Sequence, residues 1–514
     1  MSAATDPVNR EAASVEQPEV IIIGAGPTGV SAAILLAQNG VRTLVLDRWA
    51  DVYPQPRAVH LDDEIYRMLG SLGVADDFAA ITIPGAGLRL MSPKHDTLAS
   101  FVRTQRHTAN GYPQANMFDQ PELEAILRRR MLQLELITFR GNVEVTAVRC
   151  DDPDRPVVEF LDKSTGLSHT SAPRFVLGCD GAKSLTRASI GSSMKDLGFA
   201  PQRWLVVDVA SSRDLGQWDG VHQVCDSHRA ATYMQVGPSR HRWEFELLDD
   251  ESTSTYSTLE SLRPLLSPWV RDLSGFELLR LGEYTFRAQI ADRWRQDGVF
   301  ILGDAAHLTP PFIGQGMGAG MRDAGNLAWK LAGVLNGSLA TDALDTYEVE
   351  RRPHARSLIR LATFVGRSMT GGGRAGDRLR GVLLPMVVRL PGLRGRLVGS
   401  ATPALTRSAL NRRARVGHGL AGTLCPNIAL SSGQRLDDLA GQRFVLVVRD
   451  QLSDSSAARL AARDVVLVTA KEAPALGGWL GKSAAALVRP DRTVSVAGEL
   501  EAVLEQLPHP RVHS

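Results

Sequence analysis

The chain has 514 residues, of which 44% are apolar and 22% are charged. This length exceeds what one hydrophobic core usually organises, so two or three domains are expected, and the composition excludes general disorder. A net charge of +2 gives no sign of a nucleic-acid partner. The four cysteines are far apart and form no metal-ligand spacing, so free thiols and no metal site are expected.

The amino-terminal segment, residues 1–18, is polar and predicts a disordered tail. It lacks a basic start leading into an apolar stretch, which a secretory signal would have. No apolar run in the chain approaches the roughly 20 residues that cross a bilayer. A cytoplasmic protein without stable membrane insertion is therefore expected.

A βαβ unit follows this tail. The β-branched run Glu19–Ile23 predicts a buried parallel strand, and Gly24–Gly29 has the pattern GxGxxG. An Ala- and Leu-rich stretch predicts a helix to about Gln38, and Val41–Leu46 predicts a second strand that ends at Asp47. This arrangement is typical of a Rossmann-type dinucleotide-binding domain.

Each structural requirement of that βαβ unit has a candidate residue. Gly24 would make the turn, Gly26 would let the backbone approach a pyrophosphate, and Gly29 would let helix and strand pack closely. Asp47 lies at roughly the 20-residue offset at which a carboxylate meets a ribose hydroxyl. Arg48 follows it and is a further candidate for cofactor binding. The unit alone leaves NAD and FAD open.

Two later segments decide between these cofactors. Val176–Arg187 contains an Asp-Gly pair, and Val299–Met317 combines a strand, the sequence GDAAH and a Pro- and Gly-rich loop before a helix predicted at Ala319–Leu331. From about residue 19 to 355, these motifs in this order resemble the aromatic-hydroxylase group of flavin monooxygenases. That group contains para-hydroxybenzoate hydroxylase and phenol hydroxylase.

The resemblance implies FAD as cofactor and NADH or NADPH as co-substrate. Asp180 and Gly181 would lie near the pyrophosphate, and Asp304 would accept hydrogen bonds from the ribityl hydroxyls. The helix N-terminus near Gly316 and Met317 would stabilise negative charge on the reduced flavin. The candidate cofactor residues of these two segments are Asp180, Gly181, Gly303, Asp304, Gly316 and Met317.

Four more positions are interpreted through the resemblance. Arg57 matches an arginine that reaches the FAD phosphates, although an exposed loop arginine would look the same. Gln120 matches a glutamine beside the flavin, or it starts a helix. Pro311, in the loop before the flavin helix, is a hydroxylase feature and a catalytic candidate. Gly318 stands where the family usually carries asparagine, so one hydrogen bond to the flavin ring would be missing.

The middle of the chain predicts strands. Residues 200–290 are expected to form a β-sheet insert over the flavin that shapes the substrate pocket. Its pocket candidates are Tyr233, Gln235, Trp243 and Phe245, with Tyr233 also a candidate base. Alternation in a half-buried sheet explains these residues equally well.

The predicted fold is therefore α/β, with three domains and a linker. Residues 19–199 and 291–365 form the FAD-binding domain around the insert, 366–420 form a helical arginine-rich linker, and 421–514 resemble a thioredoxin-like domain without CxxC. The linker could face a membrane surface or an anion, but subunit contact in a homodimer is favoured because prolines interrupt it.

Several segments, among them Pro56–Glu64 and Thr346–Pro353, are most similar to the 3-(3-hydroxyphenyl)propionate hydroxylases. This resemblance implies ortho-hydroxylation of a small phenolic acid by O2 through an FAD C4a-hydroperoxide, in aromatic catabolism. His60 is the candidate that positions or deprotonates the phenol, or it packs at a helix start. The alternatives are the 2-hydroxyphenyl isomer, a polyketide or antibiotic aromatic, a flavin dehydrogenase or reductase, and a non-catalytic flavoprotein.

Overall fold

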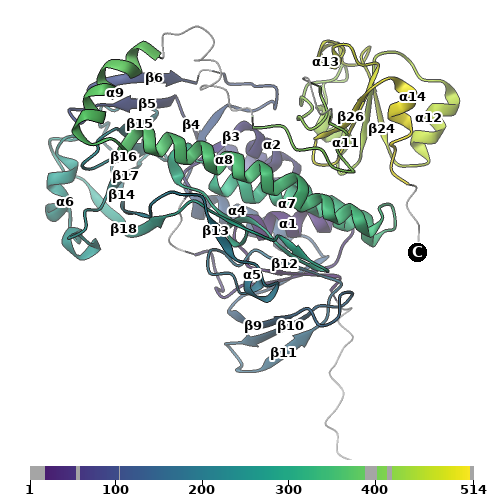
Figure 1. The fold of residues 1–514 in the computed structure, drawn as a ribbon, viewed down its shortest axis with the longest axis horizontal. Helices are drawn as coiled ribbons and strands as arrows, with labels where there is room; N and C mark the ends of the chain where they lie inside the picture. The colour runs from purple at the N-terminus through teal and green to yellow at the C-terminus, as the bar shows by residue number, and fades with distance from the viewer. Residues whose placement is uncertain (1–17, 54–57, 104, 388–401, 414–418, 510–514) are drawn as a thin grey trace, which may run out of the picture.

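A computed structural model describes residues 18–53, 58–103, 105–387, 402–413 and 419–509. The predicted tail and Arg57 fall outside these residues, as does part of the predicted linker. In Figure 1 a seven-stranded sheet and the C-terminal domain lie at opposite ends of the molecule, with the nucleotide-binding region between them. The α/β fold class is confirmed.

The nucleotide-binding region is built on a six-stranded sheet. Its strands, in spatial order, are β20 (Arg295–Gln296), β21 (Val299–Ile301), β12 (Phe175–Gly178), β1 (Val20–Ile23), β2 (Thr43–Leu46) and β8 (Ile137–Arg140). All pairs are parallel except the edge pair β20–β21. Parallel strands buried on both faces are expected to be continuously apolar, and Val20 to Ile22 are fully buried.

Helices cover this sheet, and α1 and α7 begin at the ends of the glycine-rich turn and the GDAAH loop. The helices of this region are α1 (Pro27–Gln38), α2 (Asp63–Ser71), α3 (Ala75–Ala79), α4 (Gln120–Leu132), α5 (Leu185–Ser189), α7 (Gly316–Leu335) and α8 (Thr346–Thr370). The helix expected at residues 319–331 is three residues longer at its start and four at its end. The long α8 crosses the molecule in Figure 1 and leads into α9 (Gly373–Val387).

Three small sheets complete this region. Their strands are β9 (Val143–Arg149), β10 (Val157–Asp162) and β11 (Ser168–Ser171); β13 (Met194–Asp196), β19 (Gln289–Ala291) and β22 (His307–Leu308); and β3 (His60–Asp62), β4 (Ile83–Pro84) and β7 (Ala115–Met117). The last of these sheets holds His60 in register with Met117. Its position between the two larger sheets brings His60 to the candidate site.

The seven-stranded sheet differs from the predicted insert in one respect. Its strands, in spatial order, are β18 (Glu277–Phe286), β14 (Gln202–Ala210), β17 (Arg240–Glu246), β16 (Ala231–Gln235), β15 (Val221–Val224), β5 (Gly87–Met91) and β6 (Thr97–Val102). The last two come from a segment assigned above to the FAD-binding domain, and β5 pairs parallel to β15. Pairing of this kind joins distant segments, so local sequence cannot reveal it.

The C-terminal domain has the order αβαβαββα around a four-stranded sheet, β24-β23-β25-β26. Its elements are α11 (Leu436–Ala440), β23 (Val445–Val448), α12 (Asp454–Ala461), β24 (Val466–Thr469), α13 (Pro474–Leu480), β25 (Ala485–Val488), β26 (Val494–Gly498) and α14 (Leu500–Leu504). This is the arrangement expected of the thioredoxin-like domain. Cys425, its one cysteine, is fully buried.

Buried ion pairs attach this domain to the FAD-binding region. Arg489 of the C-terminal domain donates to both carboxylate oxygens of Glu350 on α8, at 2.8 and 3.0 Å, and Lys330 of α7 donates to Glu350 at 2.9 Å. Arg67 of α2 likewise donates to both oxygens of Asp437, at 2.6 and 2.7 Å. Glu350, Lys330 and Arg489 are completely buried, so this contact is a fixed part of the fold.

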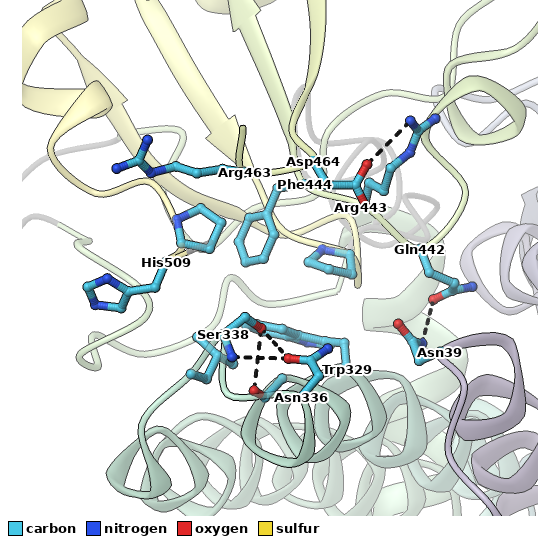
Figure 2. A pocket seen from close by; sticks show the side chains of 14 residues that line it. Asn39, Trp329, Asn336, Ser338, Gln442, Arg443, Phe444, Arg463, Asp464 and His509 are labelled. Atoms are coloured by element: carbon cyan, nitrogen blue, oxygen red, sulfur yellow. Dashed lines mark hydrogen bonds and ion pairs between the residues drawn. The ribbon is translucent and has the colours of Figure 1, made fainter. Parts of the chain in front are cut away.

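A pocket lies at the same boundary, against the C-terminal half of α7 (Figure 2). Trp329 and Asn336 line it from α7, and Phe444, Gln442 and Arg443 line it from the C-terminal domain. An α-helix rises about 1.5 Å per residue, so this pocket is roughly 20 Å or more from the N-terminus of α7. It is therefore distinct from the expected flavin position. No helix among the described residues is long and apolar enough to cross a membrane.

Candidate active site

The glycine-rich turn between β1 and α1 has filled space on one side and open space on the other. A β-carbon at Gly24, whose φ is +104°, would lie 2.7 Å from the Cys179 carbonyl carbon, and one at Gly29 would overlap the Gly24 carbonyl. A β-carbon at Gly26 would meet no atom within 4 Å. The backbone is therefore packed against the segment after β12 at Gly24 and against β1 and its own turn at Gly29, and it is accessible to a ligand at Gly26.

Asp47 ends β2 and closes the turn. Its carboxylate accepts hydrogen bonds from the backbone N–H of Ala25 and, at 2.8 Å, of Trp49. These bonds tie the second strand to the glycine-rich turn at the carboxyl edge of the sheet. Arg48 is exposed, and its carbonyl accepts a hydrogen bond from Lys163.

The Asp-Gly pair after β12 forms a capped turn. Asp180 accepts hydrogen bonds from the Ser184 hydroxyl at 2.5 Å and from the Thr186 backbone and hydroxyl, so it holds the start of α5. Gly181 has a φ of +79° and open space where a β-carbon would stand. Arg187 donates to the Ala305 carbonyl at 2.9 Å and joins this turn to the GDAAH segment.

The GDAAH segment forms a 3-10 turn, residues 303–305, directly after β21. Asp323 of α7, which the sequence analysis did not single out, organises it: this carboxylate accepts from the Gly303 N–H at 3.1 Å, His307 Nε2 at 2.8 Å and Arg351 Nε at 2.8 Å. The partners His307 and Arg351 hold the pKa of Asp323 below its usual value despite complete burial. Asp304 is half-buried beside this network.

The N-terminus of α7 begins where this loop ends. No side chain caps it, and a β-carbon at Gly316 would meet no atom within 4 Å. At Gly318 a β-carbon would lie 2.9 Å from Arg322 Nη1 and 3.0 Å from Ile65. The space that the family's asparagine would need is thus occupied by Arg322 and α2, which accounts for glycine here.

Two basic or amide side chains approach from α4. Gln120 begins that helix, accepts from the Ala58 N–H at 2.6 Å and donates to Glu124 at 2.6 Å. Arg128, also missed by the sequence analysis, is buried and donates to the Ala25 carbonyl of the glycine-rich turn at 3.2 Å. Its spacing on α4, two turns after Gln120, was the signal that could have revealed it.

His60 lies at the junction of β3 and the loop before α7. Its ring hydrogen-bonds the Gly314 backbone, and Nε2 lies 3.3 Å from Arg103 Nη1. Burial, and then the charge of Arg103, lower the pKa of His60 to about 4. The imidazole is therefore neutral at neutral pH.

The Pro-rich loop connects this site to the seven-stranded sheet. Pro311 begins a 3-10 turn, residues 311–313, is exposed, and accepts a hydrogen bond from the Gly314 N–H at 2.8 Å. The Phe312 ring lies 6.1 Å from the Trp204 ring of β14 and 5.9 Å from Phe199. Pro311 thus begins the turn of this loop. The contact of Phe312 with Trp204 shows which face of the seven-stranded sheet lies toward the candidate site.

That orientation corrects the predicted pocket residues. Tyr233, Trp243 and Phe245 are at most 2% exposed and belong to the apolar core beneath α6 (Leu259–Leu266), on the face away from Phe312. Gln235 shares their face, because it alternates with Met234 on β16. The Tyr233 hydroxyl pairs with His241 Nδ1 at 3.0 Å, and burial raises its pKa, so it is not placed to act as a base.

The opposite face, toward Phe312 and β3, carries the alternate residues. Arg242 donates to both oxygens of Asp208, at 2.6 and 2.8 Å, and Glu244 follows on the same strand. Met234 packs with Met117 and with Val59, the neighbour of His60. Burial raises the pKa of Glu244. The sequence analysis missed these side chains. Arg242, Asp208 and Glu244 make this face of the sheet polar.

This arrangement fits FAD. Two helix N-termini without side-chain caps, those of α1 and α7, leave backbone N–H groups for phosphate and for a negatively charged ring. They are close together, since a β-carbon at Gly320 of α7 would overlap Thr28 Oγ1 of α1. Open space at Gly26, Gly181 and Gly316 leaves room for the pyrophosphate and the flavin chain. The fold and site define a flavin-dependent oxidoreductase.

Comparison with known families gives the same class in finer detail. Residues 17–362 match an FAD binding domain, and residues 418–509 match the C-terminal domain of aromatic-ring hydroxylases. The chain belongs to the FAD-dependent aromatic-ring hydroxylases, and its cofactor is FAD.

Individual relatives support this placement. The chain is 32% identical to a 3-(3-hydroxy-phenyl)propionate/3-hydroxycinnamic acid hydroxylase of Burkholderia cenocepacia, with 93% of each chain covered. It is 34% identical to a probable NADH-specific resorcinol 4-hydroxylase of Rhodococcus jostii, over 68% of this chain and 66% of that protein. The structure of aklavinone-11 hydroxylase with FAD and aklavinone has the same fold, with a TM-score of 0.78, 24% identity and coverage of 95% and 98%.

Proposed function

We propose that the protein hydroxylates a small phenolic acid, such as 3-(3-hydroxyphenyl)propionate, ortho to its hydroxyl group, with NADH or NADPH and O2 as co-substrates. The observation that carries this proposal is the meeting of three elements: the uncapped α7 N-terminus, the Gly314 loop with neutral His60, and the polar face of the seven-stranded sheet. The relatives named for hydroxylation of 3-(3-hydroxyphenyl)propionate support the substrate class.

The cofactor-binding residues have defined roles in this proposal. The turn at Gly24, Gly26 and Gly29 holds the FAD pyrophosphate, with Asp180 and Gly181 shaping the adjacent turn. Asp47 and Arg48 meet the adenosine end, and the buried Arg128 adds positive charge near the phosphates. Asp304 accepts hydrogen bonds from the ribityl hydroxyls.

The N-terminus of α7 would hold the flavin ring. The N–H groups of Gly316 and Met317 would donate hydrogen bonds to it, and the helix dipole would stabilise negative charge on the reduced ring. Bound FAD, once reduced by the nicotinamide, supplies the activation of O2. By resemblance to the family, Gln120 is assigned to the flavin ring and Arg57 to the FAD phosphates.

His60 is assigned to the phenol. The ring hydrogen-bonds the Gly314 backbone, and Nδ1 is the ring nitrogen that faces Gly314, so Nε2 is assigned to accept a hydrogen bond from a hydroxyl group. A neutral imidazole in this orientation accepts a hydrogen bond from the phenol hydroxyl. This bond increases the electron density of the phenol's aromatic ring. An electron-rich ring is what oxygen transfer to the ortho carbon requires.

The test is a substrate panel with the purified FAD-loaded protein. NADH and NADPH oxidation, hydrogen peroxide and product mass are measured with 3-(3-hydroxyphenyl)propionate, its 2-hydroxyphenyl isomer, resorcinol and a polyketide phenol. We expect a product heavier by one oxygen atom with the first compound, and faster flavin reduction when it is bound. Stoichiometric peroxide without product from any phenol would instead identify a flavin oxidase or reductase.

A further inference from the structure

One partly buried cation at the site has no carboxylate partner among the residues that the structure describes. Arg103 follows β6, and its Nη1 lies 3.3 Å from Nε2 of the neutral His60 ring. Among the described residues no carboxylate lies within 4 Å of its guanidinium, whereas the more deeply buried Arg67, Arg242, Arg322, Arg351 and Arg489 each have one. Burial consequently lowers the pKa of Arg103.

The nearest carboxylates already have partners. Asp62 accepts from Arg322 Nη2 at 2.7 Å, Gln315 Nε2 at 2.9 Å and the Ile65 N–H at 2.9 Å. Asp63 accepts from Thr108 and Asn110. Both attract Arg103 from a distance without neutralising it. A desolvated guanidinium of this kind retains unused donors and favours an anion that can bind it.

The location of Arg103 identifies which anion fits. Its guanidinium touches the imidazole nitrogen that is assigned to the phenol, between β3 and the β5–β6 hairpin of the substrate sheet. The neighbouring clusters are apolar. One contains Phe101, two residues before Arg103, with Leu90 and Phe312, and the other contains Met117, the register partner of His60, with Met234. An aromatic ring with a short acidic side chain has this combination of apolar surface, hydroxyl and carboxylate.

We propose that Arg103 is the carboxylate-binding residue of the substrate site, so that the protein selects phenols with an anionic side chain. This inference rests on the proposed function for the identity of the ligand. Two parallel N–H groups of the guanidinium donate to the two carboxylate oxygens. Because Arg103 then turns from His60 toward the carboxylate, Nε2 of His60 becomes available to the phenol only when an acidic substrate is bound.

The first test measures binding to the FAD-loaded protein by calorimetry, which needs no turnover. The ligands are 3-phenylpropionate, which has no phenol, and 3-phenylpropionamide, its uncharged counterpart. We expect wild-type protein to bind the acid at least tenfold more tightly than the amide, since a charge-assisted pair of hydrogen bonds is worth about one to two factors of ten. Equal affinity for acid and amide would overturn the proposal.

The second test uses Arg103→Gln, with Arg103→Lys as the conservative variant and Arg106→Gln, an exposed arginine nearby, as control. Arg103→Gln should weaken binding of the acid by about 10- to 100-fold and leave the amide within threefold, while the Lys variant recovers part of the loss. Equal losses for acid and amide, or no loss for the acid, would overturn it. FAD content and thermal unfolding are measured alongside; if the Gln variant does not fold, the wild-type comparison decides.

Two further readouts separate this proposal from its neighbours. If the anion at Arg103 were the dinucleotide pyrophosphate, Arg103→Gln would raise KM for NADH or NADPH and leave the acid's affinity unchanged, which contradicts the proposal. If the protein hydroxylates no phenol, the proposed function fails, yet the calorimetric preference for the acid still tests the anion site. In turnover the variant should raise KM for 3-(3-hydroxyphenyl)propionate and should not raise KM for uncharged resorcinol.

Discussion

Gly314 lies directly against His60: with φ at +62°, a β-carbon at position 314 would stand 3.0 Å from the imidazole Nδ1. The same glycine hydrogen-bonds that ring through its backbone. The loop before the flavin helix and the strand that carries His60 therefore fix each other. Any change at Gly314 should reach the substrate through His60.

The first prediction concerns Gly314→Ala. A left-handed alanine costs about 1–2 kcal/mol of stability, and the new methyl group displaces His60 as well. Hydroxylation should fall several-fold, and the fraction of oxidised NADH that appears as hydrogen peroxide should rise. Gly216→Ala is the matched control, since Gly216 has a φ of +64° and open space around it. Equal uncoupling by both variants would assign the effect to backbone strain alone.

His60→Gln tests the phenol contact. Glutamine can hydrogen-bond but does not hold the ring geometry, so we expect at least a tenfold loss of hydroxylation and more peroxide, with FAD affinity unchanged. Wild-type turnover and coupling in the variant, measured from pH 6 to 9, would remove His60 from the mechanism.

The pH profile gives an independent test. Free histidine titrates near pH 6.5, but the pKa of His60 is lowered to about 4, so its neutral form persists in the folded protein across pH 6 to 9. The plot of kcat/KM against pH should show no inflection near 6.5 from this group. Because folding favours the neutral ring, this histidine also costs stability as the pH falls from about 6.5 toward 4. An inflection near 6.5 that vanishes in His60→Gln would contradict the assigned environment.

Asp304→Ala should largely abolish flavin retention, because its carboxylate is assigned to the ribityl hydroxyls. The bound FAD per protein, from the ratio of absorbance at the flavin and protein bands, should fall at least fivefold after gel filtration. Asp342→Ala, an exposed aspartate at the start of a 3-10 turn on the same domain, is the control and should keep its FAD. A fully loaded Asp304→Ala protein would show that the ribityl partner is another residue.

Arg489→Ala should destabilise the attachment of the C-terminal domain. It leaves Glu350 buried without its bidentate partner, which typically costs about 3–5 kcal/mol. Arg263→Ala removes an exposed pair with Glu260 and should leave the free energy of unfolding nearly unchanged, because solvent screens this pair. Denaturant unfolding of both variants measures the difference. Similar small losses would mean that the buried network does not hold the domains together.

The two faces of the substrate sheet should respond differently to substitution. Glu244→Gln changes a side chain on the face toward Phe312 and should alter KM or coupling with little effect on stability. Trp243→Phe changes its fully buried neighbour on the α6 face and should lower the unfolding temperature while leaving KM for the phenol within twofold. The reverse pattern, measured by steady-state kinetics and thermal unfolding, would place the pocket on the other face.

The sequence by itself determined the elements whose geometry is local. Three such elements are the turn at Gly24–Gly29, the strand before GDAAH and the helix that follows. Each is a short contiguous pattern whose turn residues and hydrophobic periodicity are compatible with one local structure. They were enough to predict the Rossmann-type dinucleotide-binding fold. The flavin cofactor and the thioredoxin-like third domain were predicted through resemblance to known families. The resemblance that these motifs support also predicted the hydroxylase family.

Only the tertiary structure decided which side chains meet at the candidate substrate site. Strand alternation shows that Trp243 and Glu244 point to opposite faces, but it does not say which face looks toward the flavin; the contact of Phe312 with Trp204 does. The pairing of β5 with β15 and the meeting of Arg103 with His60 join segments distant along the chain. Such contacts depend on how whole layers pack, and no local pattern of residues encodes them.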